Sequence, residues 1–164
     1  MQIKYRSVLA QDYLFLTEML YQALFIPPGQ KPFPKSVIET PELGKYIKDW
    51  GKQIWDVGFL ATVNSKKIAA TWGHAFHSSS PGYGYIDEHT PEITLAVQKE
   101  YRNQGIGREL LKRLLAEYKR LGCRQVSLSV SKQNPAKSLY VRFGFEVQRE
   151  EGDSLVMCKS LTEK

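Results

Sequence analysis

The stretch Arg102-Asn103-Gln104-Gly105-Ile106-Gly107-Arg108 lies between an apolar run, Ile93-Thr94-Leu95-Ala96-Val97, and a long amphipathic segment. The run predicts a strand and the segment predicts a helix, so the stretch is a strand-to-helix turn. Its two glycines let the backbone turn tightly and point successive N–H groups one way, where the positive end of the helix dipole adds to them. These residues predict a site for an anion, with a pyrophosphate favoured.

Other phosphate-binding loops do not match these letters. A P-loop requires Gly-x-x-x-x-Gly-Lys-Ser/Thr, which the chain lacks, and a dinucleotide-binding fingerprint requires a third small residue where this chain has Leu110. A glycine-containing loop that only caps a helix remains the simplest alternative, so the surrounding sequence has to decide.

The length and composition are those of an ordinary globular unit. The 164 residues, 42% of them hydrophobic, suffice for one core, and we expect a single domain over residues 1–164. The 23 Lys and Arg against 17 Asp and Glu give a net charge of +6, which favours acidic partners. Nucleic acid is disfavoured because acidic residues interleave with the basic ones and no nucleic-acid module signature is visible.

Cysteine usage and the start of the chain bear on location. Neither Cys123 nor Cys158 lies in a Cys-x-x-Cys pair, which fits a reduced, cytoplasmic setting. Residues 1–10 are charged and strand-like rather than signal-like, and no run approaches the ~20 apolar residues of a membrane-spanning helix. We therefore expect a cytoplasmic protein without membrane insertion.

Hydrophobic periodicity predicts the elements around the glycine loop. In the first half we expect a strand at 3–8, a helix after Asp12, an irregular loop with four prolines at 26–40, a helix at 41–50 and a hairpin of strands at 57–64 and 67–76. In the second half we expect a loop at 78–90, a strand at 92–97, a helix ending at Gly122, a strand at 126–130, a helix from Asn134 to Gly144 and strands at 145–149 and 154–160. This alternation predicts an α/β layered sheet.

A second motif, residues 134–145, supports one family. It reads Asn134-Pro135-Ala136-Lys137-Ser138-Leu139-Tyr140-Val141-Arg142-Phe143-Gly144-Phe145. Together with the Arg-x-x-Gly-x-Gly order upstream, it resembles the acyl-CoA-binding motifs of the Gcn5-related N-acetyltransferases (GNAT), and the element order resembles that fold from end to end. The resemblance implies one domain with a mixed, mostly antiparallel central sheet, splayed middle strands and flanking helices.

The resemblance also implies how acetyl-CoA, the acyl donor, is held. Backbone N–H groups of the glycine loop would hold the pyrophosphate, Arg102 and Arg108 would add positive charge, and the end of the preceding strand would bind the pantetheine arm. Arg102 serves equally well as a surface brace, and Asn134 as a helix cap. The implied donor-binding residues are Leu95, Ala96, Val97, Arg102, Asn103, Gln104, Gly105, Ile106, Gly107, Arg108, Asn134, Ser138 and Tyr140.

Two residues match catalytic positions of the family. Tyr140 matches the tyrosine that protonates the departing thiolate; the alternative is a tyrosine that only packs its ring on the sheet. Glu92 opens the strand before the glycine loop, where relatives place a carboxylate that deprotonates the amine directly or through water, and an ordinary strand-end acid is its alternative. Asp87 and Glu88 are reserve candidates.

The remaining candidates concern metal and acceptor binding. His74 and His77 are three residues apart, so on a strand they point to opposite faces, and we expect no metal site there or with His89. The acceptor pocket is expected from residues 25–55 and 78–90. Their aromatic side chains are Phe25, Phe33, Trp50, Trp55, Tyr83 and Tyr85, of which the two tryptophans fit core anchoring better.

The sequence thus predicts an acetyl-CoA-dependent N-acetyltransferase that moves the acetyl group to an amine by direct attack in a ternary complex. A non-catalytic acyl-CoA-binding regulatory module is the main alternative, and a nucleic-acid-binding protein is the weakest. The identity of the amine and the oligomeric state, a homodimer included, stay open.

Overall fold

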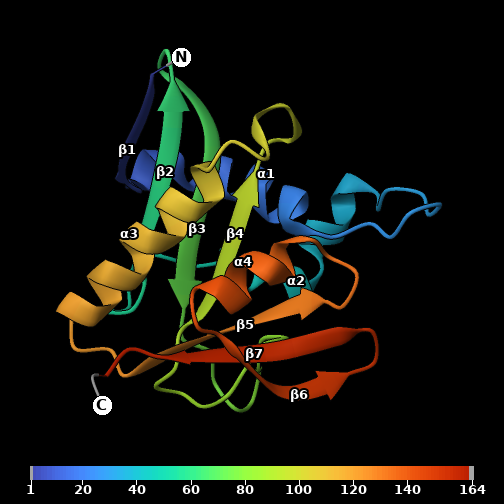
Figure 1. Ribbon diagram of the computed structural model, residues 1–164, viewed down its shortest axis with the longest axis vertical. Helices are drawn as coiled ribbons and strands as arrows, with labels where there is room; N and C mark the ends of the chain where they lie inside the picture. Colours follow the sequence, from blue (N-terminus) through green and yellow to red (C-terminus); the bar gives the residue numbers. More distant parts are fainter. Residues whose placement is uncertain (1, 163–164) are drawn as a thin grey trace.

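The computed structural model describes residues 2–162, which build a seven-stranded sheet in the order β1-β2-β3-β4-β5-β7-β6 (Figure 1). The strands are β1 Ile3–Ser7, β2 Gly58–Val63, β3 Lys66–His74, β4 Glu92–Val97, β5 Gln125–Ser131, β6 Glu146–Glu151 and β7 Ser154–Ser160. The helices are α1 Tyr13–Ala23, α2 Pro41–Gly44, α3 Ile106–Arg120 and α4 Ala136–Arg142, with short 3-10 turns η1 Ala10–Asp12, η2 Lys35–Glu39 and η3 Lys99–Tyr101.

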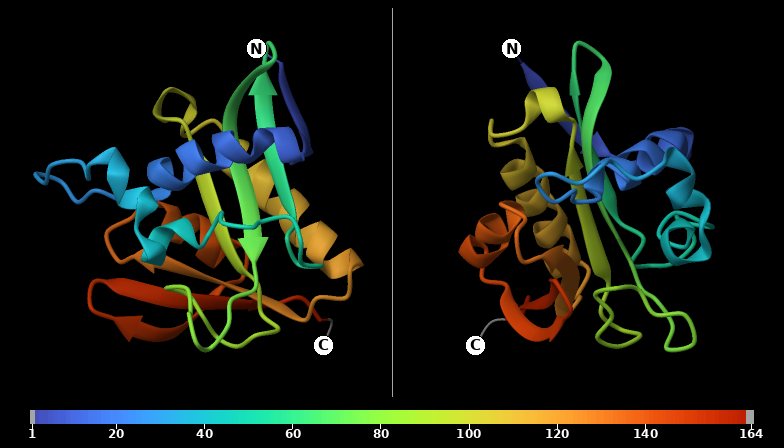
Figure 2. Two further views of the ribbon diagram at one scale, coloured as in Figure 1. Left: turned by 180° about the vertical axis from the view of Figure 1, so that it is seen from behind. Right: turned by 90° about the vertical axis from the view of Figure 1, so that its right-hand side faces the viewer.

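Helices cover both faces of the sheet, with α1 and α2 on one face and α3 and α4 on the other (Figure 2). Each face has its own core, because alternate residues of the strands point to opposite sides. On the α1 face, the buried residues are Phe15, Leu16, Met19, Leu20, Tyr46, Trp50, Leu60, Ala70, Trp72, Phe76 and Ala96. On the α3 face, Ile93, Val126, Leu128, Val130 and Met157 pack against Leu111, Leu114 and Tyr118.

The sheet splits in its middle, between β4 and β5. Every other neighbouring pair of strands is antiparallel, whereas β4 and β5 are parallel and pair at one position, Glu92 with Ser127. We call these two residues the β4–β5 junction. Beyond the junction the strands diverge, which confirms the mixed, mostly antiparallel sheet with splayed middle strands expected from the sequence.

Most of the predicted elements are present, and one helix prediction was wrong. The helix expected at 41–50 stops at Gly44, and residues 45–50 form turns with i to i+3 bonds such as Trp50 N to Ile47 O at 2.9 Å. Glycine at position 44 weakens a helix, and the positive φ angles of Asp49 (58°) and Gly51 (104°) bend the chain away from one. The apolar spacing that suggested a helix instead belongs to side chains buried in the core, Tyr46 and Trp50.

The loop with four prolines also contains structure that the sequence did not reveal. Residues 35–39 form η2, while the segment before it stands away from the body of the molecule (Figure 2).

The start of the last helix also differs from the prediction. Helix α4 begins at Ala136 rather than at the proline before it.

A buried carboxylate fixes the corner between β1 and α1. The side chain of Asp12 has no exposed surface, and it accepts hydrogen bonds from Arg6 at 2.7 and 3.0 Å and from the Leu9 N–H at 2.8 Å. Lys67 of β3 lies 2.6 Å from Asp12 Oδ1, one of the two oxygens that Arg6 also contacts. The charge is therefore paired twice, so this acid ties the first helix to two strands.

The Asp12→Asn variant keeps the shape of this side chain and removes its charge. We expect it to lower the free energy of unfolding by about 2 kcal/mol at pH 7, because two cations lose their partner. Arg6 and Lys67 hold the pKa of the Asp12 carboxyl well below its usual range, so the stabilisation is present above about pH 4 and is lost as the pH falls. Chemical denaturation at pH 7 and pH 3 measures both effects.

Asp49→Asn is the matched control for this substitution. Asp49 pairs with Lys52 at 3.4 Å on the surface, and asparagine accepts its positive φ angle, so its stability should stay near that of the parent protein. An equal decrease in the free energy of unfolding of both variants would contradict this account. So would a decrease for Asp12→Asn that is as large at pH 3 as at pH 7.

Candidate functional site

The glycine loop presents a row of unpaired backbone donors. The N–H groups of residues 103–108 make no hydrogen bond to any described residue, and the first bond of α3 runs from Glu109 N to Gly105 O at 3.1 Å. Asn103 and Gly105 adopt positive φ angles of 63° and 82°, which turn the chain so that these amides precede the helix. Six free amides at the N-terminus of a 15-residue helix form a binding site for an anion.

The two arginines of the loop differ in their surroundings. Arg102 donates from Nε to the Val97 carbonyl at 2.9 Å and from Nη2 to the Gln22 carbonyl at 3.5 Å, so it braces the end of β4 against α1. Arg108 is exposed and makes no hydrogen bond or ion pair with a described residue. The structure therefore favours the brace for Arg102 and leaves Arg108 available to an anion.

The glycine loop, the end of β4 and α4 meet at the opening between β4 and β5. A Cβ atom at Gly107 would lie 3.5 Å from Leu95, 3.7 Å from Val97 and 3.9 Å from Leu139 of α4. Beyond the junction no residue of β4 pairs with β5, so main-chain groups of Leu95, Ala96 and Val97 border this opening. The predicted donor-binding segments of the two motifs are thereby brought together.

Tyr140 is buried near the C-terminal end of α4. Its side chain is 7% exposed and packs edge-on against Phe145 at 5.7 Å, and its hydroxyl makes no hydrogen bond with a described residue. Burial raises the pKa of Tyr140 to about 12, so the phenol holds its proton at neutral pH.

The two other polar residues of this motif bond to their own helix. The Asn134 side chain accepts from the Ala136 N–H at 2.9 Å at the start of α4, as a capping side chain would, and its amide group stays available. Ser138 is exposed and donates to the Pro135 carbonyl at 3.0 Å. Asn134 therefore fits both of its predicted roles.

Glu92 is a buried carboxyl at the β4–β5 junction. It is 4% exposed; Tyr46 donates its hydroxyl to one oxygen, and the Gly84 N–H donates to the other at 2.9 Å. Burial raises the pKa of Glu92 to about 7, and the bonds from Tyr46 and Gly84 oppose the rise. This carboxyl can therefore exchange a proton near neutral pH.

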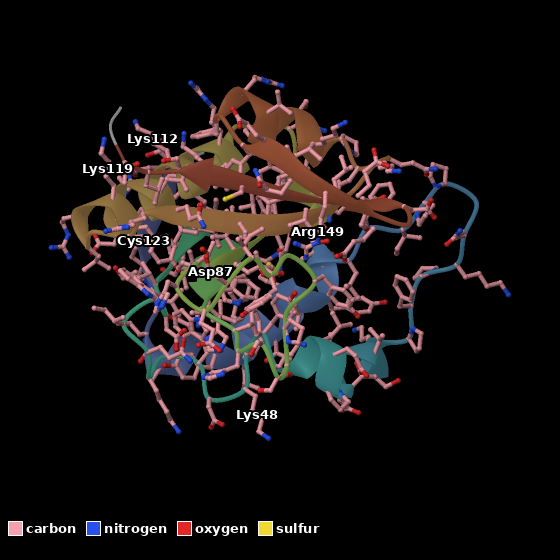
Figure 3. All side chains as sticks on the ribbon, turned by 90° about the horizontal axis from the view of Figure 1, so that it is seen from below. Lys48, Asp87, Lys112, Lys119, Cys123 and Arg149 are labelled. Carbon is pink, nitrogen blue, oxygen red and sulfur yellow. The ribbon has the colours of Figure 1, made fainter. Side chains whose placement is uncertain are left out.

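The loop of residues 78–90, which we call the roof loop, covers this carboxyl. A Cβ atom at Gly82 would lie 2.2 Å from Glu92 Oε1, and one at Gly84 would lie 2.6 Å from the Leu128 carbonyl carbon. Lys45 donates to the Pro81 carbonyl, and Arg149 reaches from β6 to the Tyr85 carbonyl at 2.9 Å (Figure 3). Only glycine fits this close to Glu92 and β5, so Gly82 and Gly84 are required here.

The sequence did not reveal Tyr46 and Gly84 as partners of Glu92. Both residues lie in segments without a motif, 46 and 8 residues from Glu92. The one visible signal was the aromatic and glycine content of the roof loop.

The histidines and reserve acids are occupied elsewhere. His74 Nδ1 lies 2.6 Å from Asp56, and His77 lies 3.0 Å from Glu88 on the surface. Asp87 accepts from the His89 N–H and the Thr90 hydroxyl at 2.8 and 2.9 Å. Within residues 2–162, no group of three or more His, Cys, Asp or Glu side chains could hold a metal ion.

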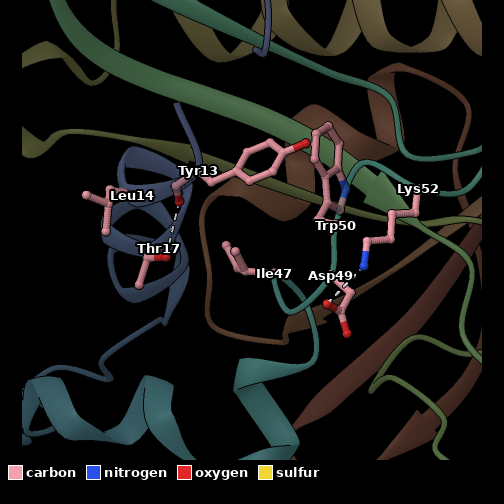
Figure 4. Close-up of a pocket in the computed structure, with 7 residues that line it drawn as sticks. All are labelled: Tyr13, Leu14, Thr17, Ile47, Asp49, Trp50 and Lys52. Atoms are coloured by element: carbon pink, nitrogen blue, oxygen red, sulfur yellow. Dashed lines mark hydrogen bonds and ion pairs between the residues drawn. The ribbon is translucent and has the colours of Figure 1, made fainter. Parts of the chain in front are cut away.

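Two of the six aromatic side chains expected near the acceptor belong to the core. Trp50 packs edge-on against Tyr13 at 5.7 Å, and Trp55 against Tyr118 at 6.2 Å, so both anchor the core as expected. A depression of about 370 Å³ lies between α1 and the turns after α2 (Figure 4). Its lining is Tyr13, Leu14, Thr17, Ile47, Asp49, Trp50 and Lys52, which includes neither Glu92 nor Tyr140.

The sequence profile of the acetyltransferase (GNAT) family matches residues 20–145. The match spans most of the chain, so the chain belongs to this family and is an acyltransferase. No curated protein sequence matches the chain significantly. None of the helices within residues 2–162 is long and apolar enough to cross a membrane.

Solved structures have the same fold. The PaiA N-acetyltransferase of Thermoplasma acidophilum, in complex with coenzyme A, is 19% identical with a TM-score of 0.71, over 98% of this chain and 99% of that one. The putative acetyltransferase YncA of Salmonella typhimurium, with acetyl-CoA, is also 19% identical, with a TM-score of 0.69 over 100% and 96%. The ribosomal-protein-S18-alanine N-acetyltransferase of Escherichia coli is 16% identical, with a TM-score of 0.67 over 99% and 96%.

The glycine loop can be tested with two substitutions on one helix. Gly105 and Gly122 lie at the two ends of α3 with φ angles of 82° and 83°, and a Cβ atom at either would meet nothing within 4 Å. Alanine at either position should cost roughly 1–2 kcal/mol of stability, because both are left-handed. Only Gly105→Ala should also weaken coenzyme A binding, by about tenfold or more, since it reshapes the row of amides.

Calorimetric titration with coenzyme A, beside thermal unfolding, measures this difference. Equal losses of affinity in the two variants would mean that general destabilisation, and not the loop, accounts for the effect.

Proposed function

We propose that residues 1–164 form one N-acetyltransferase domain that transfers the acetyl group of acetyl-CoA directly to an amine in a ternary complex. The observation that carries the proposal is the juxtaposition of six free amides, an opening between two strands and a buried carboxyl at its closed end. Coenzyme A and acetyl-CoA in the structures of PaiA and YncA support the choice of donor.

The donor site consists of main-chain groups more than side chains. The amides of residues 103–108 and Arg108 hold the pyrophosphate, and Leu95, Ala96 and Val97 bind the pantetheine arm through their backbone. Acetyl-CoA supplies an activated acetyl group as a thioester. Main-chain N–H groups near the end of β4 polarise its carbonyl, as in an oxyanion hole.

Glu92 is the general base of the proposal. An amine acceptor is protonated at neutral pH and has to lose a proton before it attacks. A pKa of about 7 suits the carboxyl to this task. Each of its oxygens already accepts one bond, and a carboxylate accepts about four, so acceptor sites remain for the amine or for a relaying water.

Tyr140 is the general acid. A phenol with a pKa of about 12 carries its proton throughout the neutral range, and this hydroxyl has no partner among the described residues. It donates that proton to the departing sulfur.

No covalent enzyme intermediate is proposed. Burial raises the pKa of both Cys123 and Cys158, so their thiols are neutral and poorly nucleophilic. Their free state supports a reducing, cytoplasmic location as part of the proposal.

Turnover against a panel of acceptors tests the proposal as a whole. The panel should contain small amines, amino acids, aminoglycoside antibiotics and peptides with free N-termini or lysines. We expect thiol release from acetyl-CoA together with a product that is heavier by one acetyl group. Binding of coenzyme A without product from any amine would instead support the non-catalytic alternative.

Removing either catalytic group should slow the chemical step. We expect Glu92→Gln and Tyr140→Phe each to lower kcat by about 10²–10⁴-fold while coenzyme A binding survives. Glu88→Gln and Tyr118→Phe are matched controls, because Glu88 pairs with His77 on the surface and the Tyr118 hydroxyl donates to the Trp55 carbonyl at 2.6 Å. Similar kcat values in all four folded variants would remove the assigned roles.

The raised pKa of Glu92 predicts opposite trends for activity and stability. The value of kcat/KM should rise with pH and level off above about 7, as the carboxyl loses its proton. The free energy of unfolding should fall as the pH rises from about 4.5 to 7, because the unfolded state has released this proton while the folded state still binds it.

Glu92→Gln should abolish both dependences. Rate profiles and denaturation between pH 5 and 8 provide the check, and a stability that rises through this window because of Glu92 would contradict the assignment.

A further inference from the structure

One buried polar atom lacks a hydrogen bond within residues 2–162, and it lies at the β4–β5 junction. The Ser127 side chain has no exposed surface, and its hydroxyl meets no partner. A serine hydroxyl both donates and accepts, and buried polar groups almost always find a partner. A partnerless hydroxyl destabilises the folded state, so its presence at this position calls for a functional explanation.

Ser127 and Glu92 share a face of the sheet. They are directly paired on parallel strands, while their neighbours Ile93, Val126 and Leu128 belong to the opposite core under α3. Adjacent strands lie about 4.8 Å apart, so the two side chains are next to each other. The Glu92 carboxyl accepts from Gly84, whose backbone lies against β5 at Leu128, so the carboxyl extends toward the strand that carries Ser127.

We propose that Ser127 is a positioning residue for Glu92. When Glu92 is ionised, the Ser127 hydroxyl rotates about its Cα–Cβ bond and donates a hydrogen bond to the carboxylate. The inference rests on the proposed function for its catalytic meaning. Tyr46 and Gly84 supply one donor to each oxygen, and Ser127 supplies a third where the charge forms. A charge-assisted bond of this kind favours the ionised base without exposing it to water.

The other charged and titratable groups around Glu92 are already engaged. Tyr46 donates to it, Lys45 and Arg149 bond to carbonyls of the roof loop, and His74, its neighbour on β3, bonds to Asp56. On the far side of Ser127, Cys158 of β7 donates to the Gln125 side chain at 3.3 Å. Ser127 is thus the polar group beside Glu92 with nothing else to bind.

The test is the titration of the Glu92 carboxyl, followed by carbon-13 NMR of the full chain. We expect Ser127→Ala to raise the midpoint by about one pH unit, because a hydrogen bond to the ionised form is lost. Ser127→Cys, with a weaker donor of similar size, should give a smaller rise. Ser129→Ala, which removes a hydroxyl two residues along the same face, should leave the midpoint unchanged.

Stability and kinetics supply readouts that a purely structural serine would not give. At pH 5, where Glu92 is protonated, Ser127→Ala should raise Tm, because it removes a partnerless hydroxyl, whereas Thr71→Val should lower it by removing the bond to the Thr94 carbonyl at 2.8 Å. The acid limb of kcat/KM should move to higher pH together with the NMR midpoint.

An unchanged midpoint in Ser127→Ala, or a lower Tm at pH 5, overturns the inference. The NMR titration needs no turnover, so a shifted midpoint in a protein that acetylates no amine would refute the proposed function and leave the contact between Ser127 and Glu92 intact. An active enzyme whose midpoint does not move would refute this inference alone.

Discussion

The single backbone pairing of Glu92 with Ser127 is the constraint on which the rest of the structure depends. It joins the antiparallel sheet of β1 to β4 to the antiparallel sheet of β5 to β7, and it does so at one end only. The strands therefore diverge toward the glycine loop, which follows the other end of β4. Continued pairing would close the opening between the strands, and no pairing would leave Glu92 without its rigid position.

Local sequence patterns account for the part of the fold that could be predicted. Local patterns sufficed for the strands, since the alternation of Val126, Leu128 and Val130 marks a face buried under α3, and the positive φ angles of Gly105 and Gly122 coincide with the two ends of that helix. The helix expected through Trp50 was wrong because its apolar spacing reflected contacts with a distant strand. Trp50 donates to the Gly73 carbonyl at 2.8 Å, which no local pattern reveals.

The candidate site was predictable where chemistry follows a contiguous motif. The glycine loop was predicted from its position between a strand and a helix, whereas Asn134, Tyr140 and Glu92 were predicted from the resemblance to the GNAT motifs. Tyr46, Gly84 and Ser127 could not be found in this way, because their relation to Glu92 depends on which strands become neighbours and how the roof loop folds back. Burial under that loop, rather than the residue type, gives the Glu92 carboxyl a pKa of about 7.

Amide chemical shifts of the nitrogen-15-labelled protein during titration with coenzyme A test the central claim most directly. If the opening beyond the junction is the donor site, the largest changes should fall on residues 95–97 and 103–108, with smaller changes at Tyr140 and along α4. Saturable binding that leaves these amides unchanged and shifts signals elsewhere, for example around the depression lined by Tyr13 and Trp50, would contradict the account.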